Sequence, residues 1–209
     1  MTGPTVTLAA EGSIDLACIR RLAMDAGLVP GDEYGRAGKL QLDKRLAGYN
    51  AGAARVPWIV ARDLDRDATC PGQLCSKLLP APAKLMCLRI AVRSIEAWLL
   101  ADCGGLAKAF QIPAGKIPKA PEELPTPKAA MINLLARSKS RDVSGAMVRG
   151  DHRRGQSLEI GPEYNTRLAD FAVTRWSPAD AAASSRSLGR AILRISELAA
   201  TARTRWPGP

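Results

Sequence analysis

Short apolar runs alternate with amphipathic segments along the first half of the chain. Three runs are apolar enough for buried strands, at residues 5–10, 56–61 and 85–92. The first run leads into a helical pattern that Ser13 should cap and Gly27 should end. Because strands and helices alternate, we expect an α/β fold with a mainly parallel sheet flanked by helices.

The segments between and after these runs are less regular. Residues 28–30 suggest a second strand, which Pro30 should cut short. A glycine-rich loop at 35–38 leads into a helix that should begin near Lys39. Another helix should follow the third apolar run over residues 94–102, with the glycine pair 104–105 as its stop.

The pattern changes after residue 112. Prolines punctuate the next stretch, and Thr126 with Pro127 has the residue types of a helix start. Residues 137–155 are basic and lack apolar periodicity, so we expect a loop there. Closing helices are expected near 163–174, 178–184 and 187–204. We therefore divide the chain into an α/β domain, 1–112, and a basic C-terminal helical extension, 113–209, packed on it.

The charge distribution adds a functional hint to this second half. The net charge is +10, although residues 1–70 carry nine Lys and Arg against nine Asp and Glu. Residues 71–209 carry 21 Lys and Arg against 11 Asp and Glu. Such an excess favours a polyanionic partner, meaning DNA or RNA. A coding bias toward arginine is an equally good explanation of the charge alone.

Other bulk features exclude several classes of protein. No apolar run approaches the ~20 residues of a membrane span, and the N-terminus lacks a signal-peptide pattern, so we expect a cytoplasmic protein without membrane contact. The five cysteines should be reduced there. Cys70 and Cys75 are closely spaced, but the single histidine, His152, completes no familiar zinc pattern with them.

Acidic residues follow two of the apolar runs. Glu11 and Asp15 come after the first run, and Asp63 and Asp65 come after the second. Because the carboxyl ends of parallel strands share one edge of a sheet, we expect these carboxylates to converge. Crowded carboxylates repel one another and favour a bound cation, and their oxygens suit Mg²⁺ or Mn²⁺. A solvated acidic loop is the alternative.

Four segments around these residues carry a resemblance to a known family. They are LAAEGSID at 8–15, WIVARDLD at 58–65, RIAVRSIEAWLLAD at 89–102 and GPEYN at 161–165. Together with Gly38-Lys39 and Gly48-Tyr49-Asn50, they resemble small bacterial proteins of the Toprim superfamily, which also includes topoisomerases, primases and OLD-family nucleases. The resemblance implies a Toprim-like, Rossmann-like sheet.

The resemblance also implies roles for the acidic residues. Glu11 would be a general acid or base or a metal ligand, and Asp63 and Asp65 would bind Mg²⁺ or Mn²⁺. Asp15 would be a further ligand or would support one. The implied reaction is metal-dependent cleavage of a phosphodiester bond, with the metal stabilising the attacking and leaving oxygens.

Further candidates come from the neighbouring charged residues. Glu96 begins a helix near the same sheet edge, where it would be another metal ligand, with Arg93 one turn earlier as a phosphate contact. A local ion pair between them is the alternative. Lys39 opens a helix after the glycine-rich loop and suits a phosphate, although the Walker pattern is absent. The basic segment adds three candidate nucleic-acid contacts, Arg149, Arg153 and Arg154.

Three functions stay open at this point. The first is a Mg²⁺- or Mn²⁺-dependent nuclease acting on DNA or RNA, for example in phage defence. The second is a non-catalytic or partner-activated module that works with a separately encoded ATPase, since this chain has no ATP-binding motif. The third is a phosphatase of the haloacid-dehalogenase type, which Asp63-Leu-Asp65 resembles, but position 67 is aspartate. A covalent role for Tyr164 is set aside, and the oligomeric state, including a homodimer, is left open.

Overall fold

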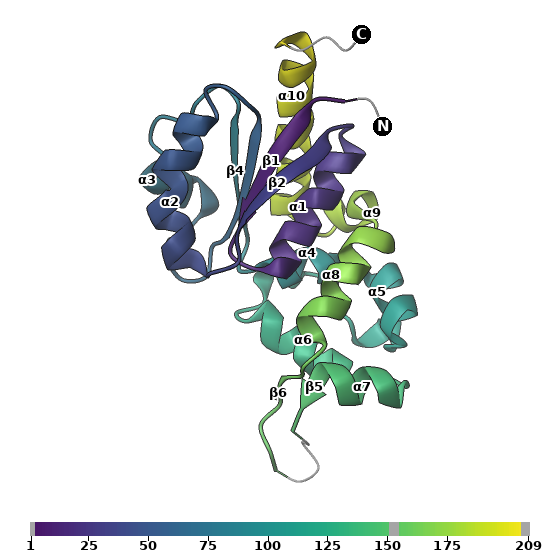
Figure 1. The fold of residues 1–209 in the computed structure, drawn as a ribbon. Coiled ribbons are helices and arrows are strands. Elements are labelled where there is room, and N and C mark those ends of the chain that lie inside the picture. The colour runs from purple at the N-terminus through teal and green to yellow at the C-terminus, as the bar shows by residue number, and fades with distance from the viewer. Residues whose placement is uncertain (1–2, 151–154, 206–209) are drawn as a thin grey trace.

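Four parallel strands form the central sheet of the protein. The computed structural model describes residues 3–150 and 155–205. The strands are β1 (Thr5–Ala10), β2 (Val29–Gly35), β3 (Trp58–Asp63) and β4 (Met86–Ala91), in the spatial order β2-β1-β3-β4. The central strands β1 and β3 are mostly buried, as expected when both faces are covered. The α/β class with a mainly parallel sheet flanked by helices is thus confirmed (Figure 1).

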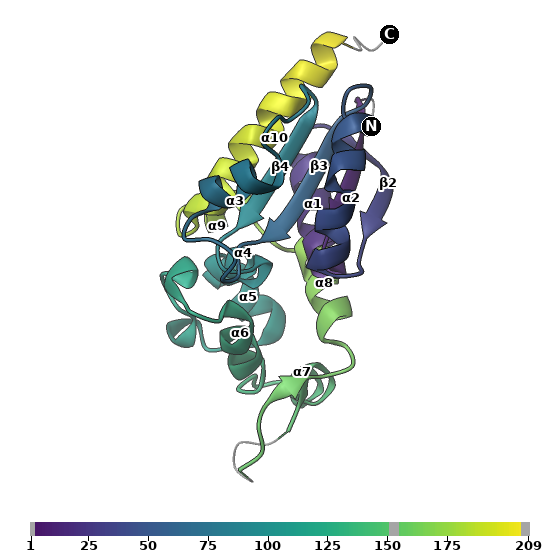
Figure 2. The same ribbon diagram turned by 90° about the vertical axis from the view of Figure 1, so that its left-hand side faces the viewer.

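Helices cover both faces of this sheet, as Figures 1 and 2 show. On one face lie α2 (Lys39–Gly52) and α3 (Pro71–Leu78), and on the other lie α1 (Ser13–Asp25) and α10 (Arg186–Arg205). The side chains of β3 alternate between the two layers. Val60 packs in the same cluster as residues of α2, and Ile59 packs in the larger cluster that contains α1. The sheet is therefore the middle of three layers.

The remaining helices lie largely beyond the carboxyl ends of the strands, and α8 also packs along α1 (Figure 2). They are α4 (Ile95–Ala101), α5 (Cys103–Phe110), α6 (Pro127–Leu135), α7 (Arg141–Met147), α8 (Tyr164–Thr174) and α9 (Pro178–Ala182), with 3-10 turns at Ala114–Lys116 and Pro121–Glu123. A short antiparallel hairpin pairs β5 (Val148–Arg149) with β6 (Glu159–Ile160). Trp98 of α4 and Phe171 of α8 share a buried cluster with α1, so both parts of the chain contribute to one core.

Several element predictions in the second half of the chain are confirmed. α6 begins at Pro127, and the three closing helices α8, α9 and α10 begin and end within two residues of their predicted bounds. None of the helices in residues 3–150 and 155–205 is both long and apolar enough to cross a membrane.

Two predictions near the start of the chain are wrong. Pro30 does not cut β2 short, because the strand continues to Gly35. β2 lies at an edge of the sheet, where proline is tolerated because only one side of the strand is paired. Ser13 is not the N-cap of α1. It is the first helical residue, and Gly12, with extended backbone, takes the capping position.

Two later predictions are also wrong. The helix predicted at 94–102 is α4, but the glycines 104–105 are not its stop, because both lie inside α5. The Asp102 carboxylate accepts the N–H of Gly105 at 2.8 Å, and a Cβ there would lie 2.2 Å from that carboxylate. The glycine therefore admits the capping side chain. Segment 137–155 is not a loop throughout either, since α7 forms within it, capped by Ser140.

A buried serine of α10 forms hydrogen bonds with residues of the core. The Ser187 hydroxyl accepts hydrogen bonds from Trp98 Nε1 at 2.7 Å and from the N–H of Val92 at 3.3 Å. Replacing Ser187 with alanine should lower the free energy of unfolding by about 1–3 kcal/mol, because a buried indole N–H loses its acceptor. Urea denaturation followed by tryptophan fluorescence measures this. Ser196→Ala, at an exposed position of the same helix, is the control. Equal midpoints for the two variants would contradict the assignment.

Candidate functional site

Glu11 and Asp63 meet at the carboxyl edge of the sheet. The register pairs Ala10 of β1 with Ala61 of β3, so the residues that follow these two positions leave the sheet side by side. Glu11 Oε1 accepts a hydrogen bond from the backbone N–H of Asp63 at 2.9 Å. The structure therefore brings together the two acidic motifs, which lie far apart in the sequence.

A cavity of about 720 Å³ opens at this edge. Seven residues singled out from the sequence line it, namely Glu11, Asp15, Lys39, Asp63, Asp65, Arg93 and Glu96. Thr126, Lys128 and Asn165 of the helical part line it as well, so both parts of the chain form its wall.

The other nucleic-acid candidates lie elsewhere. Arg149 is exposed on the β5–β6 hairpin, at the end of the helical part farthest from the sheet, and does not line the cavity (Figure 1). Arg153 and Arg154, with His152, lie outside the described residues.

Asp15 is a buried carboxylate with an unsatisfied oxygen. It projects from the first turn of α1, and only 7% of its surface is exposed. Its Oδ1 has no hydrogen-bond partner. Burial, followed by the charge of Glu96 and then that of Glu11, raises the pKa of Asp15 to about 7. The side chain therefore sits where a proton or a cation would stabilise it.

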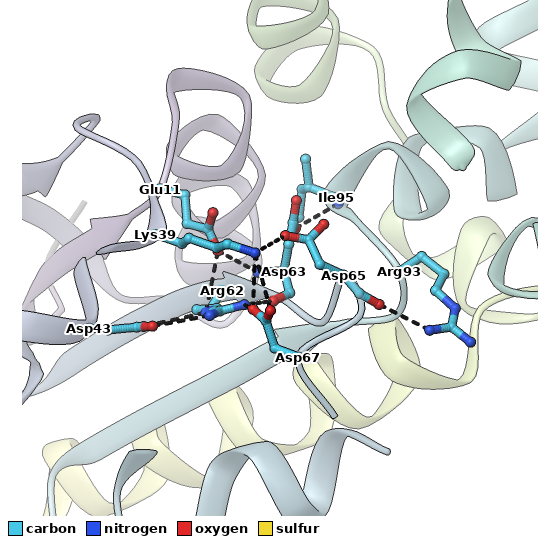
Figure 3. Close-up of polar contacts among 9 residues, drawn as sticks. All are labelled: Glu11, Lys39, Asp43, Arg62, Asp63, Asp65, Asp67, Arg93 and Ile95. Carbon is cyan, nitrogen blue, oxygen red and sulfur yellow. Dashed lines mark hydrogen bonds and ion pairs between the residues drawn. The ribbon is translucent and has the colours of Figure 1, made fainter. Parts of the chain in front are cut away.

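Asp63 lies beside the amino end of α4. Its Oδ1 accepts the N–H of Ile95 at 2.9 Å, as Figure 3 shows. Burial raises the pKa of Asp63 well above its ordinary value, and the negative charges of Asp15 and Glu96 add to this effect. Three carboxylates from α1, β3 and α4 thus interact strongly within one cavity.

Glu96 is held by two hydroxyl groups. Ser94 Oγ donates to one of its oxygens at 2.6 Å, and the Tyr164 hydroxyl donates to the other at 3.3 Å. Burial and the charge of Glu96 both raise the pKa of Tyr164, so the phenol keeps its proton. Arg93 donates instead to the backbone carbonyl of Asp65 at 2.9 Å. Arg93 and Glu96 therefore do not form the local ion pair that the sequence allowed.

The outer side of the cavity carries a different arrangement, in which carboxylates are paired with cations (Figure 3). Lys39 Nζ lies 2.8 Å from Asp65 Oδ2 and 3.1 Å from Asp67 Oδ2. The hydrogen bond with Asp65 is the main reason why the pKa of Lys39 is raised. Lys39 therefore meets carboxylates, although its sequence context suggested a phosphate.

Arg62 is a buried cation that joins three acidic side chains. Its guanidinium lies 3.0 Å from Asp43 Oδ2, 2.6 Å from Asp67 Oδ2 and 3.6 Å from Glu11 Oε1. Burial lowers the pKa of Arg62, but the hydrogen bonds with Asp43 and Asp67 outweigh it and raise the pKa above its ordinary value. Arg62 was not predicted as a site residue. The signal available was an arginine among the apolar residues of the strand WIVARD.

The carboxylate oxygens that line the cavity are chemically suitable ligands for a hard divalent cation. Carboxylate oxygens are the ligands that Mg²⁺ and Mn²⁺ prefer. Within residues 3–150 and 155–205, however, no three acidic, histidine or cysteine side chains are already arranged around one point. Glu11, Asp63 and Glu96 each accept a hydrogen bond from the protein, so a cation here would share these carboxylates with protein donors. Asp15 Oδ1 is free to bind as it stands.

Comparison with known proteins gives no match: no family model fits the chain, and no curated protein and no solved structure is significantly similar to it.

Proposed function

We propose that this protein is a Toprim-type phosphodiesterase that cleaves DNA or RNA with the help of Mg²⁺ or Mn²⁺. The unpartnered Oδ1 of buried Asp15, in a cavity shared with Asp63 and Glu96, is the observation that carries the proposal. An uncompensated buried charge is costly, and a bound cation offsets that cost. An acidic loop in solvent would leave no such oxygen buried.

Three side chains would hold the ion, Asp15, Asp63 and Glu96, each from a different element. When bound, the ion supplies positive charge for the phosphoryl oxygens and lowers the pKa of a water molecule. Tyr164 and Ser94 keep Glu96 oriented through their hydroxyl groups. These contacts fix a carboxylate that would otherwise be free to rotate.

Glu11 lines the same cavity and is assigned the role of proton acceptor, since the other three carboxylates would hold the ion. Burial raises its pKa, although the N–H of Asp63 and the charge of Arg62 oppose the rise. In the reaction, water adds to phosphorus, the ester P–O bond breaks, and the leaving oxygen takes up a proton. Glu11 accepts the proton of the attacking water.

A nucleic-acid substrate is supported by cations at the rim of the cavity. Arg66 and Lys128 are exposed, line the cavity, and come from the sheet part and the helical part respectively. Phosphates on either side of the cleaved bond would contact them. A role in phage defence, in the cytoplasm, is the biological setting that we propose for such an activity.

A nicking assay on supercoiled DNA and on single-stranded RNA tests this function. Asp63→Asn should lower the Mg²⁺- or Mn²⁺-dependent rate by about a hundredfold or more, since the variant loses a charge from the ligand set. Asp32→Asn, at an exposed position of β2 outside the cavity, is the matched control and should behave as the wild type. Equal cleavage by wild type and Asp63→Asn would refute the proposal.

A partner-activated version of the same site is the second candidate. It is favoured by one observation, the protein hydrogen bonds that now engage Glu11, Asp63 and Glu96. A partner such as a separately encoded ATPase would shift these side chains toward an ion. In this case the purified protein is inert, and adding the ATPase encoded beside it restores metal-dependent cleavage.

A further inference from the structure

The carboxylates of the cavity fall into two groups with different partners. The inner group is Asp15, Asp63 and Glu96. The charge of Glu96 adds to burial in raising the pKa values of Asp15 and Asp63, and Asp15 Oδ1 has no hydrogen-bond partner. The outer group is Asp65 and Asp67, whose side chains are both bound to Lys39. The inner group therefore contains a buried oxygen without a partner, whereas the outer carboxylates share the Lys39 cation.

The backbone that delivers Lys39 is fixed to the sheet. The N–H of Gly38 donates to the carbonyl of Glu11 at 3.2 Å, and that of Arg36 donates to the carbonyl of Ala10 at 3.0 Å. Gly35 permits this approach, because its φ is +103° and a Cβ there would lie 1.9 Å from the carbonyl oxygen of Ala10. Lys39 therefore follows a loop whose backbone is hydrogen-bonded to the end of β1.

The carboxylate that meets this ammonium is fixed too. Asp65 has a φ of 47°, in the left-handed region, which aspartate tolerates better than most residues. Its N–H donates to the carbonyl of Arg93, and Arg93 Nη1 donates to its carbonyl, both at 2.9 Å. Backbone hydrogen bonds thus fix the positions of both Lys39 and Asp65. An ordinary surface ion pair joins two side chains whose backbones are not held in this way.

An ammonium carries three N–H donors. Asp65 takes one of the Lys39 donors, and the two oxygens of Asp67, at 3.1 and 3.3 Å, share another. One donor is left at the wall of the cavity that the inner carboxylates also line. Lys39 therefore offers a positive charge and a hydrogen-bond donor next to the proposed metal position.

Many phosphodiester-cleaving enzymes use two metal ions, one for each oxygen of the displacement. We propose that Lys39 takes the place of the second ion, so that this site binds one divalent cation and the Lys39 ammonium binds the substrate phosphate. The inference rests on the proposed function of the same cavity. Asp65 and Asp67 then hold Lys39 in position and are not metal ligands.

Mn²⁺ titration by calorimetry on the full chain tests the proposal. Wild type should bind one Mn²⁺, and Asp65→Asn should still bind it with a Kd changed by less than about threefold. Lys39→Met should bind a second, weaker ion, because Asp65 and Asp67 lose their ammonium. Lys39→Arg, which keeps the charge, and Lys44→Met, at an exposed position of the same helix, should each bind one.

Two results would overturn the inference while leaving the proposed function intact. One is two ions in wild type with one of them lost in Asp65→Asn, which would make Asp65 a metal ligand. The other is a single unchanged ion in Lys39→Met, which would make Lys39 an ordinary ion pair. If wild type and Lys39→Met both bind no ion, the metal site itself is refuted, and this inference falls with it. Circular dichroism checks that each variant is folded.

Discussion

Replacing Asp15 with asparagine should raise the melting temperature in EDTA at about pH 8 by roughly 5 °C or more. The pKa of Asp15 is about 7 in the folded protein, against an ordinary value of 3.8. A carboxyl with a raised pKa contributes stability below about pH 4, and this contribution is lost as the pH rises through 7. The rise in the pKa of Asp15 corresponds to a loss of at most about 4 kcal/mol in the free energy of unfolding. Asparagine is neutral and avoids this loss.

A bound metal ion should restore the stability that wild type loses when Asp15 is ionised, and should have little effect on Asp15→Asn. A divalent ion competes with protons for the carboxylates, so Mg²⁺ or Mn²⁺ should raise the wild-type melting temperature more at about pH 8 than at about pH 5. Asp15→Asn should lose most of this stabilisation, and Asp32→Asn should retain it. If Asp15→Asn and wild type melt alike in EDTA at both pH values, the account of a strained carboxylate is wrong.

Replacing Arg62 with alanine should lower the free energy of unfolding by about 3–5 kcal/mol. The side chain is 4% exposed and lies against Asp43, Asp67 and Glu11. Removing it leaves these carboxylates without their shared cation in a partly buried place. Urea denaturation measures the loss.

An exposed arginine provides the control for this substitution. Arg45 lies on the solvent side of α2, and Arg45→Ala should change the free energy of unfolding by about 0.5 kcal/mol or less. Similar unfolding midpoints for the two alanine variants would contradict the role given to Arg62.

The convergence of Glu11 with Asp63 could be predicted from the sequence. Each follows a short apolar run, and parallel strands bring their carboxyl ends to one edge whatever the exact length of the elements between them. The pattern of apolar positions is strong in β1, β3 and β4, where both faces are buried. It is weak in β2, an edge strand with exposed positions, and there the prediction stopped too early.

The partners of the charged residues could not be predicted in the same way. A lysine after a glycine-rich loop has one sequence signature whether it meets a phosphate or the carboxylates of Asp65 and Asp67. The contact of Tyr164 with Glu96 joins α8 to α4 across 68 residues, and nothing local signals it. Arg62 was recognisable as a charged residue in an apolar strand. Its partners could not be predicted, because Glu11, Asp43 and Asp67 lie in separate segments of the chain.

The inner carboxylates Asp15, Asp63 and Glu96 are proposed to bind one divalent cation. Crystals soaked in Mn²⁺ at about pH 8, above the pKa of about 7 of Asp15, show the position of the ion through anomalous scattering at the manganese absorption edge. We expect a single peak in the cavity, contacted by Asp15, Asp63 and Glu96, with Lys39 still bound to Asp65. A cavity without a peak, or a peak between Asp65 and Asp67 with Lys39 displaced, would contradict it.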